Sequence, residues 1–319
     1  SKIPLEGLRK LLIPLYFSTL FSLIAVKLIG TSALGAQRWI SFGVINIQPS
    51  EIAKLTCILV LASVLERHDF KRPRNILKPT SIILLPWILV FIQPDLGTSL
   101  VFGAILVIML YWAGMPSEWS LIFLSAVPTL IFACNLPSGL FVWIPIIGFL
   151  GYRSLPNRRV FFILIVALHT VMASLAPWLW TYGLQSYQRD RLSLFLDPTK
   201  DPLGGGYHLI QSKIAIGSGG LFGTGILQGQ LTKLGFIPEQ HTDFIFSALG
   251  EEAGFLGAFL VIMLFCIFVI RLIQISKEAR TNFESLVVIG IATMFMFQIM
   301  VNIFMTIGLG PVTGIPLPF

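Results

Sequence analysis

The chain has 319 residues, of which 55% are hydrophobic and 12% charged, with a mean hydropathy of +0.85 and a formal net charge of +7. A soluble domain carries about 25% charged residues, so this composition excludes an ordinary soluble globule, a disordered chain and a coiled coil. Lysine and arginine gather in short links between apolar runs, not on a face with interleaved aromatic residues, which argues against a nucleic-acid partner. We therefore expect an all-α fold, a polytopic helical bundle in a membrane.

Nine apolar runs along the chain are candidates for membrane-spanning helices, each of which needs about 20 mostly apolar residues. In chain order they cover residues 11–30, 51–65, 79–94, 98–114, 119–135, 139–151, 160–180, 244–271 and 285–309. The second and sixth runs are short, and the fourth is also compatible with a re-entrant segment. The sequence thus predicts about nine spans within a single membrane domain over residues 1–319.

The basic residues predict the orientation of this bundle, because cytoplasmic links carry an excess of lysine and arginine. With the N-terminus in the cytoplasm, the inner links hold Lys2, Arg9, Lys10, Arg67, Lys71, Arg72, Arg74, Lys78, Arg153, Arg158, Arg159, Arg271, Lys277 and Arg280. The long segment 181–243 then forms an extracytoplasmic loop, with five basic and five acidic residues. Within it, residues 207–216 (YHLIQSKIAI) are predicted to form a short amphipathic helix at the bilayer surface.

Ionisable side chains at or within the apolar runs are candidates for function, because a membrane makes them costly. Glu51 and Lys54 lie three residues apart on one helical face, either as functional groups or as a buried ion pair that holds the bundle together. In the second case, replacing either one alone is expected to reduce stability. Asp95 and Asp243 each precede an apolar run, where a carboxylate serves equally well as a helix cap.

Other polar or glycine-rich features have simpler interpretations. Glu251 and Glu252 are expected to pair with cations, and His169 to pack in the core. The glycine cluster, Gly217 to Gly225 (GSGGLFGTG), follows no strand and precedes no Gly-Lys-Ser/Thr, so it is neither a P-loop nor a Rossmann fingerprint. We expect it to be flexible loop backbone, although clustered amides also suit an anion. His208 and His241 lack the spacing of a zinc site.

Long motifs in the chain resemble the SEDS family of cell-wall proteins (shape, elongation, division and sporulation), in its RodA branch more than its FtsW branch. These motifs are GAQRWISFG with QPSEIAK (35–54), QPDLGTS (93–99), the stretch from YQRDRL to FGTG (187–225), PEQHTDFIFSALGEEAG (238–254), and Asn302, Gly308, Pro311 and Gly314 near the end. Three departures from the family are expected: its first two helices are absent before Ser1, its last helix is absent after Phe319, and a helical hairpin is added between 119 and 151.

The resemblance implies a peptidoglycan glycosyltransferase that builds cell wall during elongation, determining cell shape. Its substrate is lipid II, an undecaprenyl-pyrophosphate-linked disaccharide peptide, polymerised on the outer face of the bacterial cytoplasmic membrane. The resemblance also implies Asp243 as the catalytic carboxylate, with Glu51, Lys54 and Asp95 as supporting residues. A class B penicillin-binding protein and the elongation machinery are the implied partners.

Glycosyl transfer needs a base for the acceptor hydroxyl and cations for the departing pyrophosphate. We expect Asp243 to be that base in an inverting transfer, or else to hold a divalent cation, Mg²⁺ or Mn²⁺. No other cofactor is expected. The candidates for the pyrophosphate are Arg38, Lys54, Arg189, Arg191 and Lys213, with the arginines favoured because a guanidinium binds phosphate through two hydrogen bonds. The alternatives are a lipid II flippase without bond chemistry and, third, a scaffold that recruits the transpeptidase.

Overall fold

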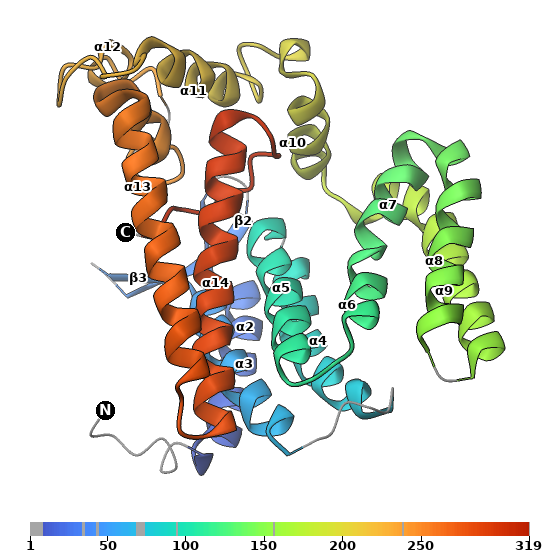
Figure 1. The fold of residues 1–319 in the computed structure, drawn as a ribbon. Coiled ribbons are helices and arrows are strands. Elements are labelled where there is room, and N and C mark those ends of the chain that lie inside the picture. Colours follow the sequence, from blue (N-terminus) through green and yellow to red (C-terminus); the bar gives the residue numbers. More distant parts are fainter. Residues whose placement is uncertain are drawn as a thin grey trace. The chain divides into compact units, whose positions relative to one another are not determined.

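The computed structural model describes residues 9–33, 36–42, 45–67, 74–93, 95–155, 157–237 and 239–318. These residues fold almost entirely into helices (Figure 1), which confirms the predicted all-α class. The chain divides into two units. The first comprises Ser1–His68, Leu77–Met109 and Asp190–Phe319, and the second comprises Asp69–Ile76 and Leu110–Arg189. The single membrane domain stays a prediction.

The first unit contains the N-terminal helices, most of α4 and α5, and everything from the second half of α10 onward. Its helices are α2 (Leu12–Ile29), α3 (Pro49–Leu65), α4 (Arg74–Ile92), α5 (Leu96–Trp112), α10 (Ser186–Leu196), the 3₁₀ turn η3 (Pro198–Lys200), α11 (Tyr207–Ser218), α12 (Gln230–Lys233), α13 (Ile245–Lys277) and α14 (Asn282–Ile307). Helices α13 and α14 run side by side as an antiparallel pair, and α14 also packs on α3 (Figure 1). Helix α11 confirms the short helix predicted within the long loop.

A small antiparallel sheet between α2 and α3 was not predicted from the sequence. Its strands are β1 (Thr31–Ala33), β2 (Ala36–Phe42) and β3 (Ile45–Ile47), in the order β1-β2-β3. In register, Thr31 pairs with Trp39 and Phe42 with Ile45. Strands β1 and β3 have three residues each, too few for a clear alternating pattern in the sequence, and antiparallel pairing with β2 stabilises them.

The second unit contains the helices of the hairpin predicted between 119 and 151; that this hairpin is an addition to the family pattern stays a prediction. Its helices are α6 (Ser117–Leu124), α7 (Ala126–Asn135), the 3₁₀ turn η1 (Pro137–Gly139), α8 (Leu140–Ser154), α9 (Arg158–Trp178) and the π-helical turn η2 (Leu179–Gly183). The predicted run 119–135 is broken between α6 and α7, because Pro128 has no N–H for the carbonyl of Leu124. His169 is buried, as predicted, with its ring nitrogens 2.7 Å from Thr129 Oγ1 and 3.3 Å from Ser125 Oγ.

All nine predicted runs fall on helices, but not all of those helices are long enough to cross a bilayer by themselves. Five are long and apolar enough: Asn75–Ile92, Ser117–Cys134, Arg158–Gly183, Ile245–Lys277 and Asn282–Ile307. Two more apolar helices, Leu12–Leu28 and Leu96–Trp112, are slightly shorter. The number of spans, their orientation and the extracytoplasmic position of the long loop therefore remain predictions.

Helix α13 is continuous in hydropathy but interrupted in backbone geometry at Gly254, whose φ and ψ angles are 65° and −165°. The interruption leaves carbonyl groups without helical partners, and the glycine cluster supplies donors for them. The Thr224 N–H donates to the carbonyl of Glu251 at 3.0 Å. The Gly225 N–H donates to the carbonyl of Glu252 at 3.1 Å.

The glycine cluster also accepts hydrogen bonds from the N–H groups that follow the interruption. Phe255 donates to the carbonyl of Gly220 at 2.9 Å, and Leu256 donates to that of Leu221 at 3.1 Å. These bonds replace the helical bonds that are lost, as a chain in a membrane requires. The prediction of flexible loop backbone is therefore wrong, and two of the amides considered for an anion are already bonded to α13.

Candidate active site

Asp243 lies two residues before α13, in a loop that α14 holds in place. Its side chain is half-buried, and its main-chain carbonyl accepts a hydrogen bond from Nδ2 of Asn302 at 2.8 Å. The same Nδ2 donates to the carbonyl of Ile315 at 2.8 Å, and Asn302 is fully buried. One side chain of α14 thus fixes both the Asp243 loop and the segment after α14. The N-cap of α13 is Phe244, so Asp243 is not the cap residue considered in the sequence.

Arg191 of α10 and Asp243 meet at Gly314, in the segment that follows α14. Gly314 has a φ angle of +74°, and a Cβ atom there would lie 3.4 Å from Asp243 Oδ2 and 3.7 Å from Arg191 Nη1. Both charged groups therefore lie against one stretch of backbone, where the positive φ angle favours glycine. Among the candidate phosphate ligands of this unit whose side chains the structure describes, Arg191 is placed beside Asp243.

His208 of α11 is a further ring next to this pair of charged residues. It stacks on Phe244, with ring centroids 5.9 Å apart and an interplanar angle of 20°. Burial lowers the pKa of the His208 imidazole below its ordinary value, and the positive charge of Arg191 lowers it further, against a smaller opposite effect of Glu239. His208 is therefore held in its neutral form, stacked on Phe244, the residue that follows Asp243.

We expect this lowered pKa to make the stability of the protein pH-dependent through His208. As pH falls below about 6.5, the unfolded chain binds a proton before the folded chain does. The stabilisation contributed by neutral His208 is thus fully present above that pH and is lost as pH falls toward the folded-state pKa. His208→Gln should weaken the pH dependence of the apparent unfolding temperature, whereas the exposed-site variant His241→Gln should keep it. Identical profiles for wild type and His208→Gln would contradict this expectation.

Buried hydroxyl groups tie α11 to α13 and α14 beneath the site. The Oγ atoms of Ser212 and Ser247 lie 2.5 Å apart, and Ser212 also donates to the carbonyl of Thr306 at 2.7 Å. The residue after Ser212, Lys213, lays its side chain over Gly308. An added Cβ at Gly308 would overlap Lys213 Cε. Gly308 ends α14 in the left-handed conformation, with a φ of +79°. Lys213 is thereby held at the C-terminal end of α14.

Glu51 and Lys54 form the predicted ion pair, with Lys54 Nζ 2.8 Å from Glu51 Oε2. The two partners differ strongly in exposure, because the Lys54 side chain is 1% exposed and that of Glu51 is 49% exposed. Glu51 lies in the first turn of α3, where the helix dipole also favours a carboxylate. The pair is therefore buried on one side only, which changes what each single replacement is expected to do.

We expect Glu51→Gln to destabilise the protein by about 3 kcal/mol, the lower end of the cost of leaving one buried charge unpaired. Lys54→Met should cost less than about 1 kcal/mol, because it replaces the buried charge with an apolar chain of similar length. The apparent unfolding temperatures of the two variants measure this difference. Equal losses in both variants would support the symmetrical expectation drawn from the sequence.

Asp95 is the helix-capping residue that the sequence offered as one alternative. It is 4% exposed, and its Oδ1 accepts the Thr98 N–H at 3.2 Å at the start of α5. Its Oδ2 accepts from Nε2 of Gln48 at 3.2 Å, which links the starts of α5 and α3. At Gly97 an added Cβ would lie 2.9 Å from the Thr313 carbonyl. Asp95 thus positions helix ends beside the same segment on which Asp243 and Arg191 meet.

The remaining predicted residues lie elsewhere. The side chain of Arg38 is outside the described residues, although its backbone belongs to β2. Arg189 belongs to the second unit, and its role as a phosphate ligand stays a prediction. Glu251 does not pair with a cation as expected: it is 1% exposed and accepts the N–H groups of Leu231 and Thr232 at 2.8 and 2.9 Å. Its carboxylate caps the short helix α12.

Sequence reasoning did not identify His208 or Gly314 as parts of the site. His208 carries no spacing signal, and its position depends on stacking with Phe244. Asn302 and Gly314 are noted only within the family motif. A polar residue inside an apolar run, such as Asn302, is the kind of signal that points to a structural or functional role in a membrane helix.

The described residues also bear on the predicted divalent cation. Among them, no three His, Cys, Asp or Glu side chains come together as a group that would hold a metal ion. A single carboxylate such as Asp243 does not form a protein cage for Mg²⁺ or Mn²⁺, which bind through carboxylates together with substrate phosphates. The described residues thus form no cage for a resident metal ion, and a cation held by Asp243 together with substrate phosphates stays a prediction.

The chain matches the FTSW_RODA_SPOVE family, described as "Cell cycle protein", over residues 1–160 and 122–319. Peptidoglycan glycosyltransferase MrdB of Escherichia coli is 36% identical over 308 residues, covering 95% of this chain and 70% of MrdB. Peptidoglycan glycosyltransferase RodA of Treponema pallidum is 38% identical over 325 residues, covering 92% of this chain and 74% of RodA.

Solved structures agree with these sequence matches. A chain from a peptidoglycan synthase complex, described for its structural coordination of polymerization and crosslinking, has a TM-score of 0.69 and 28% identity, covering 99% of this chain and 76% of that chain. RodA of Thermus thermophilus has a TM-score of 0.58 at 23% identity, covering 99% and 72%, and supports the fold alone. The chain is a multi-pass membrane protein that belongs to the FtsW/RodA/SpoVE family of cell cycle proteins.

Proposed function

We propose that this chain is a peptidoglycan glycosyltransferase that polymerises lipid II into glycan strands, with Asp243 as its general base. The activity class rests on family membership and on relatives that carry it in their names. The observation that assigns the chemistry to residues is the meeting of the Asp243 carboxylate and the Arg191 guanidinium at Gly314. A base and a cation at one place are what glycosyl transfer from a pyrophosphate needs.

In the proposed step, the Asp243 carboxylate removes the proton from the 4-hydroxyl group of the acceptor sugar. The hydroxyl oxygen attacks the anomeric carbon of the donor sugar from the face opposite its pyrophosphate. A glycosidic C–O bond forms, the bond from the anomeric carbon to the phosphate oxygen breaks, and the electron pair leaves with the polyprenyl pyrophosphate. Asp243 ends the step protonated, and the anomeric configuration is inverted.

The departing pyrophosphate gains negative charge in this step, and Arg191 is the residue best placed to stabilise it. Its guanidinium donates several N–H bonds in a plane, which suits two phosphate oxygens at once. Lys213, held at the C-terminal end of α14, is a second cation of the same unit and the next candidate. Glu51, Lys54 and Asp95 support the site indirectly, because they fix the starts of α3 and α5.

The proposed setting is the outer face of the bacterial cytoplasmic membrane, where lipid-linked precursor is used after it has crossed the bilayer. Support for this face comes from the distribution of lysine and arginine, which predicts that the loop carrying Arg191 and Asp243 lies outside. The proposed partner is a class B penicillin-binding protein that crosslinks the product. It is supported by the likeness to a synthase complex that coordinates polymerization and crosslinking.

The test combines the purified protein, its penicillin-binding partner and labelled lipid II. Glycan products on a gel are expected from the wild type. If no polymer forms while lipid II still crosses the membrane of reconstituted vesicles, the chain is a flippase and the glycosyltransferase proposal fails. Addition of EDTA to the same assay tests the predicted requirement for Mg²⁺ or Mn²⁺.

A further inference from the structure

A cavity lies at the end of α3 opposite Glu51 and Lys54, between α2, α3 and α4. It has a volume of about 350 Å³, within the usual range of ligand pockets. Its walls are largely apolar and include Leu12, Ile13, Tyr16, Phe17, Val60 and Ile82. The Tyr16 hydroxyl donates to the carbonyl of Ile82 at 2.6 Å, which fixes α2 against α4 across this space. Nothing in the proposed polymerisation uses this cavity.

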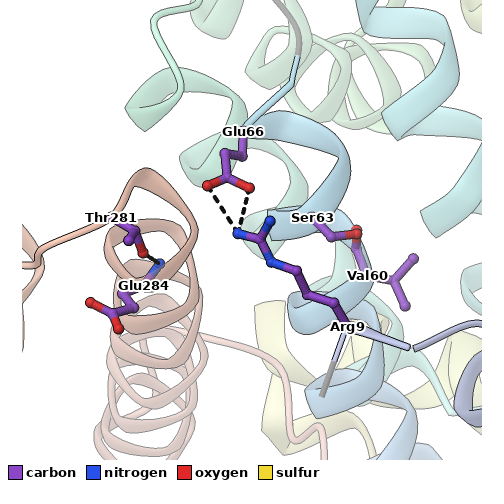
Figure 2. A network of polar contacts seen from close by, with 6 residues as sticks. All are labelled: Arg9, Val60, Ser63, Glu66, Thr281 and Glu284. Carbon is purple, nitrogen blue, oxygen red and sulfur yellow. Dashed lines mark hydrogen bonds and ion pairs between the residues drawn. The ribbon is translucent and has the colours of Figure 1, made fainter. Parts of the chain in front are cut away.

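Three cations border the cavity: Arg9, Arg67 and Lys78. Arg9 is already engaged, because its Nη2 donates to both carboxylate oxygens of Glu66 at 2.7 and 3.0 Å (Figure 2). Its guanidinium also lies 4.8 Å from the ring centroid of Phe283. Its buried Nε–H has no acceptor among the described residues. Glu66 thus offsets one of the three positive charges and leaves an excess around the cavity.

Arg67 and Lys78 carry this excess. Both side chains are exposed, and neither forms an ion pair with any residue that the structure describes. Both line the cavity, Arg67 from just after α3 and Lys78 from the start of α4. By the predicted topology this end of the bundle faces the cytoplasm.

We propose that this cavity binds an anionic phospholipid of the cytoplasmic leaflet, with the headgroup phosphate on Arg67 and Lys78 and the start of an acyl chain along α2. The cavity has cations at one end and an apolar wall at the other, which favours a lipid over a free phosphate. The cations match a phosphate, and basic pockets between helices on the cytoplasmic side suit anionic headgroups. The apolar wall continues onto the outer surface of α2, where Ile13 is 70% and Phe17 63% exposed. That surface offers an acyl chain a path into the hydrocarbon.

The test measures the affinity of fluorescent phosphatidylglycerol for the purified protein in a neutral detergent, with phosphatidylcholine as the competitor. We expect the double variant Arg67→Gln/Lys78→Gln to bind phosphatidylglycerol at least about tenfold more weakly than wild type. The matched control is Arg271→Gln/Lys277→Gln, which removes two exposed cations of the predicted cytoplasmic side outside the cavity. Its affinity should stay within about twofold of wild type. Because all four replaced side chains are exposed and none forms an ion pair within the described part of the chain, both double variants should keep the wild-type unfolding temperature.

Three results would overturn the lipid site. Equal losses of affinity in the two double variants would show that phosphatidylglycerol responds only to overall charge. An unchanged affinity in Arg67→Gln/Lys78→Gln would show that these cations bind no headgroup. Displacement of the lipid by inorganic phosphate at equal concentration would show that the cavity binds phosphate without regard to the acyl chain. None of these readouts involves polymerisation, so they test the lipid site independently of the role of Asp243.

Discussion

Asp243→Asn should reduce lipid II polymerisation by about 10²- to 10⁴-fold, the usual contribution of a general base. The substitution keeps the size of the side chain but removes its ability to take a proton. Folding should be retained, because the contact that holds the loop is the main-chain carbonyl of Asp243, which accepts from Asn302 and is unaffected. The initial rate of glycan formation, measured with the partner protein and labelled lipid II, is the readout.

The matched control for this prediction is Asp190→Asn on α10. Asp190 is an exposed aspartate next to Arg191 in the sequence, so the control removes the same charge close to the site without touching its base. It should polymerise within about threefold of wild type, as surface changes usually have small effects. Wild-type rates in Asp243→Asn would show that this carboxylate only organises the loop. Equal losses in both variants would point to the net charge of the region and against proton transfer.

The carboxylates of this site could be selected from the sequence, whereas their pairing with Arg191 and Gly314 could not. Asp95 and Asp243 stand out because a carboxylate beside an apolar run is costly without a reason. Arg191 is one of five cations that the sequence offers for the pyrophosphate, and no local signal selects it from the others. Gly314 lies beside Asp243 because Asn302 binds both the segment after α14 and the loop before α13. Contacts between distant parts of the chain follow from packing, which a single sequence does not display.

For the helices as well, features that depend on local sequence were predicted, and features that depend on distant contacts were not. Each predicted apolar run carries a helix, because hydropathy over about 20 residues is a local property. The interruption of α13 was not predicted, since one glycine in an apolar run is compatible with a continuous helix. What makes Gly254 the break is the glycine cluster, whose backbone bonds to both sides of it. The sheet between α2 and α3 was missed for a related reason, because its short strands depend on pairing with one another.

Gly223→Ala should destabilise the protein by about 3 kcal/mol, through two separate effects. Gly223 has a φ angle of +82°, and an L-residue in the left-handed region costs about 1–2 kcal/mol. An added Cβ would also overlap the carbonyl oxygen of Glu252, so the loop must move away from α13. That movement breaks the bonds from Thr224 and Gly225, each of which contributes about 0.5–1.5 kcal/mol. The apparent unfolding temperature in detergent measures the loss.

Two other glycines of the same cluster separate these effects. Gly220 has a φ angle of +54° but open space around its Cβ position, so Gly220→Ala should lose only the conformational part, about 1–2 kcal/mol. Gly217 lies in α11 with open space around it, so Gly217→Ala should be neutral or stabilise the helix by up to about 1 kcal/mol. The expected order of unfolding temperatures is Gly217→Ala, then Gly220→Ala, then Gly223→Ala as the lowest.

If the unfolding temperature of Gly223→Ala is no lower than that of Gly220→Ala, close contact between the cluster and α13 contributes little to stability, and the interrupted helix does not depend on that contact. If the order holds, the cluster stabilises the helix that begins two residues after Asp243, the proposed base, and Gly223→Ala should slow polymerisation as well as lower the unfolding temperature.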